Sequence, residues 1–151
     1  MISKPESDPN FFANFKPLQS KRILVVEDDI STRDLFKFIF EEAGAQVIAV
    51  LSIKEAIEVL QNLQPDVLVS NMKMPDGDGF ALIETVRESE VGKTVPALLV
   101  TGLPEWEYGP KARRLGYEKY LTKPIDPEKL VEEVCHLVKK GVNCSLTADE
   151  D

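Results

Sequence analysis

Five short runs of β-branched and aliphatic residues alternate with longer segments of helical period, and this alternation constrains the fold most. The runs cover residues 22–26, 46–50, 67–70, 97–101 and 120–122. Strands of this length that alternate with helices are typical of a parallel sheet covered on both faces. The sequence therefore predicts an α/β fold with a helical layer on each side of one sheet.

Several of the predicted helices carry their own start signals. Ser52 and Glu55 form a capping box, in which each side chain can bond an amide at the helix start. Asp126 can cap the last helix, and Pro127 suits its first position. The buried stripe of the first helix is expected to consist of Leu35, Phe36, Ile39, Phe40 and Ala43.

The fourth helix is the one place where local rules predict irregular structure. Pro104, Gly109 and Pro110 lie close together after the fourth strand. A proline inside a helix removes a hydrogen bond and clashes with the preceding turn. We therefore expect a loop over residues 103–109 and a helix only from Pro110 to Leu115.

The length of 151 residues and the 43% hydrophobic content favour one folded domain. We assign residues 1–20 to a flexible N-terminal arm, 21–140 to the domain and 141–151 to a polar C-terminal tail. The arm contains Phe11, Phe12 and Phe15. It is either a disordered tail or a segment that docks on the domain or on a partner, since clustered aromatic side chains are disfavoured in water.

The composition argues against several classes of partner. With 26 acidic and 18 basic residues, the chain has a formal net charge of -8 and should repel nucleic acids. No apolar run approaches the roughly 20 residues needed to span a bilayer, so we expect a cytoplasmic protein. Cys135 and Cys144 match no zinc or thioredoxin-type spacing, and we expect two free thiols.

Polar residues follow the predicted strands at their carboxyl ends. They are Glu27-Asp28-Asp29, Asn71, Thr101 and Lys123. Ligands of open parallel sheets bind at this edge, where acidic groups suit Mg²⁺ while a hydroxyl and an ammonium suit a phosphoryl group. Taken singly, each residue is equally well explained as a turn, a helix cap or an ordinary strand residue; the joint spacing supports a site.

The motifs that contain these residues resemble the receiver domains of bacterial two-component response regulators. They comprise residues 23–29, 65–75, 78–79, 101–102 and 120–124, and the match spans about 21–140. The resemblance implies a flavodoxin-like (βα)5 three-layer sandwich with a parallel sheet in the order 2-1-3-4-5.

The resemblance also implies a role for each site residue. Glu27 and Asp28 occupy the acidic pair, with Asp28 as the direct Mg²⁺ ligand, and the backbone carbonyl of Lys73 is a further ligand. Thr101 and Lys123 match the groups that contact the phosphoryl oxygens. Tyr120 matches the switch aromatic that turns inward when the site is phosphorylated.

One position departs from the family, because Asn71 stands where the aspartate nucleophile is expected. A neutral carboxamide cannot form the acyl phosphate that a carboxylate forms. The change also removes one charge and one hard ligand, so Mg²⁺ should bind weakly if it binds. Ser70 points to the opposite face of its strand, and its phosphorylation is a minor alternative.

The leading hypothesis is a stand-alone receiver-like module of a phosphorelay that is phosphorylation-independent and not an enzyme. Only about a dozen polar residues follow the last helix, so output should pass through protein contacts. The expected partner is a sensor kinase, a phosphotransfer protein or another regulator, bound at the fourth helix, fifth strand and fifth helix. Trp106 and Tyr108, on the altered fourth helix, would make this partner face different from that of other receivers.

Two alternatives remain open. Asn71 could have been introduced into an ordinary phosphoacceptor receiver to hold it unphosphorylated. The chain could instead be a phosphatase-like hydrolase with Asp28 or Asp29 as nucleophile, since strand-end carboxylates also serve phosphoryl transfer.

Overall fold

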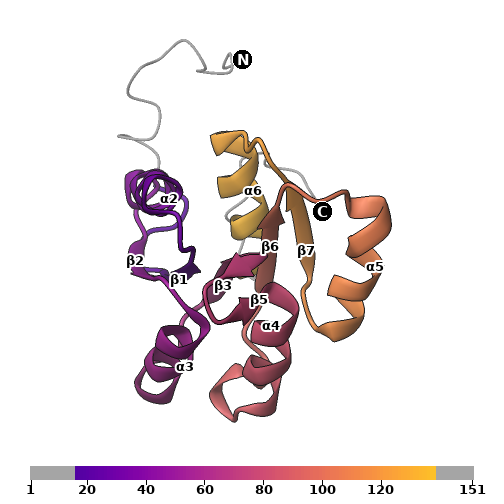
Figure 1. The fold of residues 1–151 in the computed structure, drawn as a ribbon. Coiled ribbons are helices and arrows are strands. Elements are labelled where there is room, and N and C mark those ends of the chain that lie inside the picture. Colours follow the sequence, from indigo (N-terminus) through magenta and orange to yellow (C-terminus); the bar gives the residue numbers. More distant parts are fainter. Residues whose placement is uncertain (1–15, 139–151) are drawn as a thin grey trace.

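The five predicted runs form one parallel sheet in the computed structural model, which describes residues 16–138 (Figure 1). Its strands are β1 (Arg22–Val26), β2 (Gln46–Val50), β3 (Val67–Asn71), β6 (Ala97–Thr101) and β7 (Lys119–Thr122). They pair in the order β2-β1-β3-β6-β7. Counted along the chain these are strands 2-1-3-4-5, so the predicted topology is confirmed.

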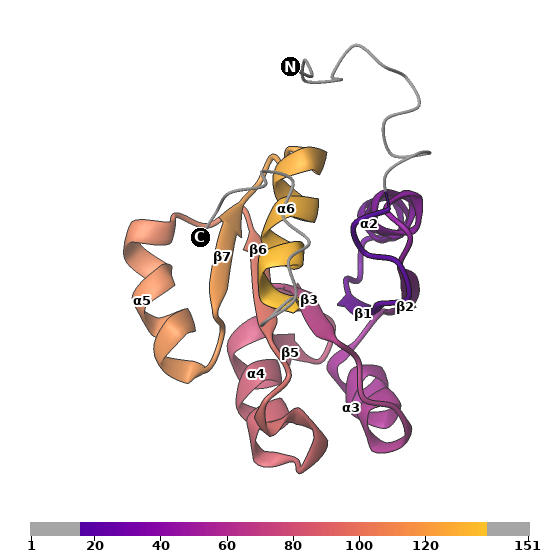
Figure 2. The ribbon, with the colours of Figure 1, turned by 180° about the vertical axis from the view of Figure 1, so that it is seen from behind.

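Five helices cover the sheet in two layers (Figures 1 and 2). They are α2 (Ile30–Glu42), α3 (Ile53–Asn62), α4 (Gly79–Glu88), α5 (Glu105–Leu115) and α6 (Pro127–Val138), and a 3-10 turn, η2 (Val91–Lys93), follows α4. One core lies between the sheet and α2 and α6, and the other lies under α3, α4 and α5. The strands alternate their side chains between these two cores, so both faces of the sheet are buried.

The helix starts follow the predicted chemistry and add one contact that sequence did not reveal. The Ser52 hydroxyl accepts the Glu55 amide at 3.1 Å, and the Glu55 carboxylate accepts the Leu51 amide at 2.8 Å. A small hairpin of β4 (Lys73–Met74) and β5 (Gly77–Asp78), which we did not predict, follows β3. Within this hairpin, Asp76 accepts the amides of residues 53 and 54, so it joins the hairpin to α3.

The prediction of an irregular fourth helix was wrong, because α5 is helical from Glu105 to Leu115 with Pro110 inside it. The carbonyl of Pro104 accepts the amides of residues 107 and 108, which closes the first turn. Glu105 pairs with Arg113 two turns later, and the Lys111 ammonium lies 4.6 Å from the ring centre of Phe80 on α4. These contacts and the buried side of the helix outweigh the one hydrogen bond that Pro110 removes.

Two side chains near the N-terminal part of the domain differ from expectation. Leu35 was predicted to be buried but is 51% exposed, whereas Phe36, Ile39, Phe40 and Ala43 are buried as expected. Leu18 is fully buried, and its amide donates to the carbonyl of Ala43. The packed unit therefore includes residues that the sequence analysis places in the N-terminal arm, while Phe11, Phe12 and Phe15 lie outside the described residues, as does Cys144.

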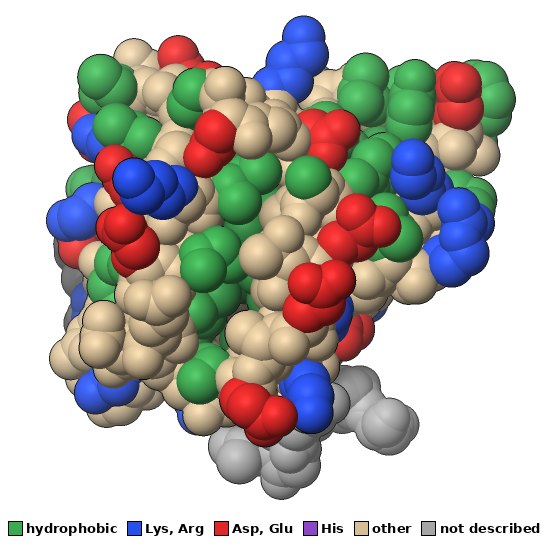
Figure 3. Space-filling model, turned by 60° about the horizontal axis from the view of Figure 1, so that its bottom comes forward, with side chains coloured by type: hydrophobic (Ala, Val, Ile, Leu, Met, Phe, Trp, Pro, Cys, Tyr) green, Lys and Arg blue, Asp and Glu red, His purple; other side chains and the backbone are tan. Residues whose placement is uncertain are grey.

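The surface carries charges of both signs. On the face shown in Figure 3, acidic and basic side chains are interspersed with apolar ones. Among residues 16–138, no helix combines the length and the apolar character needed to cross a bilayer.

Candidate functional site

The carboxyl ends of four neighbouring strands bring together four of the predicted site residues. Glu27 follows β1, Asn71 ends β3, Thr101 ends β6 and Lys123 follows β7. The Lys123 ammonium lies 3.4 Å from Asn71 Oδ1 and 3.6 Å from Glu27 Oε1. The Lys123 amide donates to the Thr101 carbonyl at 2.8 Å, which anchors the loop after β7 to the site.

The carboxamide of Asn71 is the centre of this group. Its Nδ2 donates to Glu27 Oε2 at 3.2 Å and to the Lys73 carbonyl at 3.1 Å, while its Oδ1 accepts from Lys123. Only this orientation of the amide places donors toward two acceptors and the oxygen toward the ammonium. Asn71 therefore joins an anion, a carbonyl and a cation, which a carboxylate could not do.

Glu27 is a buried acid, with 1% of its surface exposed. Burial raises the pKa of Glu27, although the Asp29 amide and the charge of Lys123 act in the opposite direction. Its Oε2 accepts the Asp29 amide at 3.1 Å, whereas its Oε1 has an ion-pair neighbour in Lys123 but no hydrogen bond. The carboxylate is thus held in place with one oxygen incompletely satisfied.

The other two acidic residues of the run after β1 have different positions. Asp29 caps α2, since its carboxylate accepts the amide of Thr32 at 2.9 Å and the hydroxyl of Thr32 at 2.7 Å. The hydrogen bond from the Thr32 side chain is the largest reason why the pKa of Asp29 is lowered. Asp28 is exposed. The acidic run therefore provides a buried site residue, an exposed acid and a helix cap.

Thr101 and Tyr120 hold the loop that follows β6. The Thr101 hydroxyl accepts the Leu103 amide at 3.3 Å, and the Tyr120 hydroxyl donates to the Leu103 carbonyl at 2.9 Å. Tyr120 is 6% exposed, and burial raises the pKa of its phenol. The ring of Tyr120 therefore lies inside the domain, and its hydroxyl holds the loop after β6 in place. The Leu103 backbone was not foreseen as a partner, because residue types alone do not determine the path of the loop after β6.

Ser70 lies on the other side of β3, as the alternation of strand side chains predicted. It is 1% exposed, and its hydroxyl donates to the Asn71 carbonyl at 2.7 Å. The hydroxyl is therefore buried and occupied rather than open to a phosphodonor.

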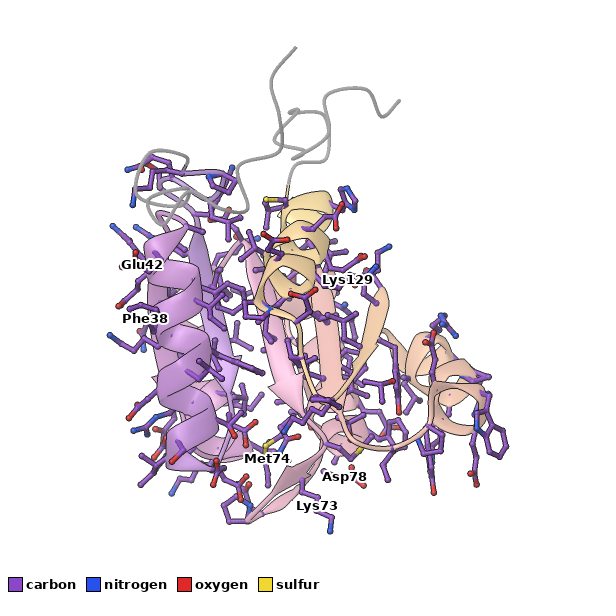
Figure 4. All side chains as sticks on the ribbon, turned by 90° about the horizontal axis from the view of Figure 1, so that it is seen from above. Phe38, Glu42, Lys73, Met74, Asp78 and Lys129 are labelled. Atoms are coloured by element: carbon purple, nitrogen blue, oxygen red, sulfur yellow. The ribbon has the colours of Figure 1, made fainter. Side chains whose placement is uncertain are left out.

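Two of the oxygens that a Mg²⁺ ion would use at this edge already have another partner. Glu27 Oε2 and the Lys73 carbonyl converge on one point, but Asn71 Nδ2 lies there and donates to both. Asp28 adds one exposed carboxylate, and Lys73 points its side chain away from the domain (Figure 4). Within residues 16–138, no three His, Cys, Asp or Glu side chains are grouped to hold a metal.

A parallel sheet in this order, with an acid, an amide, a hydroxyl and an ammonium at its carboxyl edge, defines a receiver-type signalling module. The family model described as "Response regulator receiver domain" matches residues 23–135. The chain belongs to this family, whose members act together with other proteins in phosphorelay signalling.

Two relatives match most of this chain in sequence. The chain is 46% identical over 112 residues to the "Uncharacterized 14.6 kDa protein in sodA1 3'region" of Leptolyngbya boryana, covering 74% of this chain and 86% of that protein. It is 26% identical over 121 residues to the phosphate regulon transcriptional regulatory protein PhoB of Escherichia coli, covering 80% of this chain and 53% of PhoB. The chain thus spans about half the length of that regulator.

Two receiver structures show the same fold. The receiver domain of the Francisella response regulator 1452 is 28% identical with a TM-score of 0.75, over 80% of this chain and 98% of that one. The receiver domain of sensor histidine kinase PA1611 from Pseudomonas aeruginosa, which has a magnesium ion in its active-site cleft, has a TM-score of 0.73 over 79% of this chain and 98% of that one. Its identity of 21% supports the fold alone.

Proposed function

We propose that this chain is a receiver module that works without phosphorylation and without enzymatic activity, through protein-protein contacts. The observation that carries the proposal is the carboxamide of Asn71, which bonds Glu27, Lys73 and Lys123 at once. When an acyl phosphate forms, one oxygen of the carboxylate attacks phosphorus and the other oxygen remains as the carbonyl. The amide of Asn71 offers one carbonyl oxygen and no anionic one.

The same contacts support a site that is complete without an ion. A Mg²⁺ ion would have to displace Asn71 Nδ2 from Glu27 Oε2 and from the Lys73 carbonyl, and would then gain a site with one charge fewer. We therefore propose that Mg²⁺ binds weakly at most. Thr101 and Lys123 keep the phosphate-contact positions of the family, but here they hold the Leu103 loop and the Asn71 carbonyl.

Tyr120 supports a fixed conformation of the switch region. By resemblance this ring turns inward when a receiver is phosphorylated, and here it is buried and bonded to the Leu103 carbonyl. Since no phosphoryl group can form on Asn71, we propose that this inward position is permanent. The module would then present one state of its surface to its partners.

The proposed partner surface consists of α5, β7 and α6. Trp106 on α5 is 80% exposed, and a tryptophan is among the residues that most often dominate binding energy. An open pocket of about 330 Å³, lined by residues of α5, β7 and α6, carries charges of both signs. Its lining residues are Glu105, Arg113, Glu118, Lys119, Tyr120, Leu121, Lys129 and Glu133. Such a surface suits a protein partner with a matching pattern of charges, such as a kinase, a phosphotransfer protein or another regulator.

The test is incubation with a small acyl phosphate donor and Mg²⁺, followed by intact mass spectrometry. We expect no stable mass gain for the native sequence and a gain of one phosphoryl group for Asn71→Asp. The Asn71→Asp/Ser70→Ala double variant should behave like Asn71→Asp, because Ser70 is buried. A phosphoryl group on the native chain that is lost in Asn71→Ala would overturn the proposal.

The two alternatives have separate tests. If Asn71 replaces an aspartate of the natural protein, the native coding sequence will show it directly. If the chain is a hydrolase, it should turn over a generic phosphate ester with Mg²⁺ and lose this activity in Asp28→Ala. Asp29 is the weaker candidate nucleophile, because it is engaged at the start of α2.

A further inference from the structure

Helix α2 exposes large apolar side chains that the fold does not use. Within residues 16–138, the large hydrophobic side chains that are exposed are Ile30, Leu35, Phe38 and Trp106, and the first three lie on α2. Phe38 is 62% exposed and points away from the sheet (Figure 4). Leu35 and Phe38 are three residues apart and thus neighbours on the helix surface; we call them the α2 outer pair.

The core does not need the α2 outer pair, because another side of the helix already fills it. Phe36 and Phe40 are buried against the sheet with ring centres 6.4 Å apart. An exposed apolar pair on a helix that is otherwise well packed indicates a surface that something else covers.

The described chain begins against the end of this same helix. The Lys16 ammonium donates to the Glu42 carbonyl at 3.1 Å, and the Leu18 amide donates to the Ala43 carbonyl at 2.8 Å. A Cβ on Gly44 would meet Lys16 Cβ at 3.0 Å, so the two segments are in close contact. The described chain therefore begins at the C-terminal end of α2, where Glu42 lies about one turn from Phe38.

The distances allow the preceding phenylalanines to reach the α2 outer pair. At about 1.5 Å per residue, Phe38 and Leu35 lie roughly 6 Å and 10 Å before Glu42 along the helix axis. At about 3.3 Å per residue, an extended chain can carry Phe12 roughly 13 Å from Lys16. Phe15 is adjacent to Lys16 in the sequence. Phe15 and Phe12 can therefore reach the same range of distances along α2 as Phe38 and Leu35.

We propose that residues 11–15 dock on the outer face of α2 and cover Leu35 and Phe38 with their phenylalanine side chains. The occupant is this chain's own N-terminal segment, and the driving force is burial of aromatic and aliphatic surface. The covered surface lies away from Trp106, since α2 packs beside β2 and α5 packs beside β7, at opposite edges of the sheet.

The test uses a nitroxide label just before the phenylalanines, on the full chain. Asn10→Cys is combined with Cys144→Ser, while Cys135 is buried and should not react. We expect the label to broaden the amide NMR signals of residues 35–42 in particular. Replacing the three phenylalanines at 11, 12 and 15 with serine should remove this broadening, and so should Leu35→Ser/Phe38→Ser.

Matched controls separate docking from unspecific contact. Trp106→Ser removes an exposed aromatic side chain at the other edge of the sheet and should leave the broadening unchanged. Broadening that also appears when labelled and unlabelled chains are mixed would assign the α2 outer pair to a second copy and overturn the proposal. Broadening that is absent, or unchanged after removal of the phenylalanines, would overturn it as well. None of these results bears on the chemistry of Asn71.

Discussion

The side chain of Asn71 places a neutral donor at the position where a receiver of this family is expected to carry a charged oxygen. The donor satisfies Glu27 Oε2 and the Lys73 carbonyl, two acceptors that would otherwise call for a cation. This explains how a 1% exposed glutamate is tolerated at the carboxyl edge of the sheet. The carboxamide therefore stabilises the acidic pocket at the position where we propose that it prevents phosphoryl transfer.

Asn71→Asp should make stability depend on Mg²⁺. Without the ion, the variant places a second carboxylate beside Glu27, and we expect a loss of about 1–3 kcal/mol in the free energy of unfolding. Added Mg²⁺ should restore stability to the variant and leave the native chain unchanged, since only the variant gains a ligand-binding native state. Urea unfolding with chelator and with Mg²⁺ measures both effects.

A surface variant controls for the added charge. Asn62→Asp introduces the same charge on the exposed end of α3 and should respond to Mg²⁺ as the native chain does. Equal stabilisation of the native chain and of Asn71→Asp by Mg²⁺ would contradict the idea that the amide takes the place of the ion.

Residue types and spacing predicted the site better than they predicted its contacts. The positions of Glu27, Asn71, Thr101 and Lys123 at strand ends were sufficient to bring them together, because parallel strands end at one edge. The hydrogen bonds of Asp29 and of the Leu103 backbone were not foreseen as part of the site. They depend on the path of loops, which residue types alone do not determine.

Helix α5 shows where local rules and tertiary structure disagree. The sequence predicted a loop up to Gly109 because two prolines and a glycine lie close together, yet α5 begins at Glu105. Acidic residues in its first turn and Arg113 and Arg114 in its last turn favour the helix dipole. A Cβ on Gly109 would meet Glu105 Cγ at 2.9 Å, so the glycine leaves room for the pair of Glu105 with Arg113.

Pro110→Ala should therefore stabilise the protein. Alanine restores a donor to the carbonyl four residues earlier and removes the clash of the ring, and Pro110 is exposed, so little packing is lost. Removal of the proline also gives the unfolded chain more conformational freedom, which offsets part of this gain. We expect a net gain of about 1–2 kcal/mol in the free energy of unfolding.

Pro127→Ala is the matched control for this change. Pro127 is the first residue of α6, where a helix amide has no partner within the helix, so the substitution should be close to neutral. Chemical unfolding of both variants decides the matter. Equal effects of the two substitutions would show that Pro110 costs α5 nothing.

At the scale of the whole molecule, three carboxylates hold elements in place, and two of them connect elements that are separate in the sequence. Asp29 lies at the junction of β1 and α2, Asp76 joins the hairpin to α3, and Glu133 on α6 pairs with Lys119 of β7 at 3.2 Å. The hydrophobic periods predicted the layers that these groups connect. They did not predict the connections made by Asp76 and Glu133, because these depend on residues that the completed fold brings together.

These carboxylates should make the fold sensitive to acid. Hydrogen bonds from Thr32 and from the Ile53 amide lower the pKa of Asp29 and of Asp76. Burial alone would raise the pKa of Glu133, but Lys119 and Lys129 outweigh burial and lower it. A lowered pKa means that the folded state prefers the charged form. Its contribution is complete above the ordinary values of 3.8 for Asp and 4.5 for Glu and is lost as the pH falls through the lowered values.

Glu133→Gln should test this dependence on a single group. The substitution removes the charge that faces two partly exposed lysines, so we expect a loss of about 1 kcal/mol at neutral pH. It should also flatten the fall in stability between about pH 5 and about pH 2, because a glutamine at position 133 cannot take up a proton in this range. Glu132→Gln removes the same charge from the neighbouring residue and controls for net charge.

Glu27 has a raised pKa, so its own contribution to stability is lost as the pH rises, and it cannot mimic the acid effect. Parallel acid dependence of the native chain and of Glu133→Gln, measured by urea unfolding, would rule out the pairing on α6 as a source of acid sensitivity.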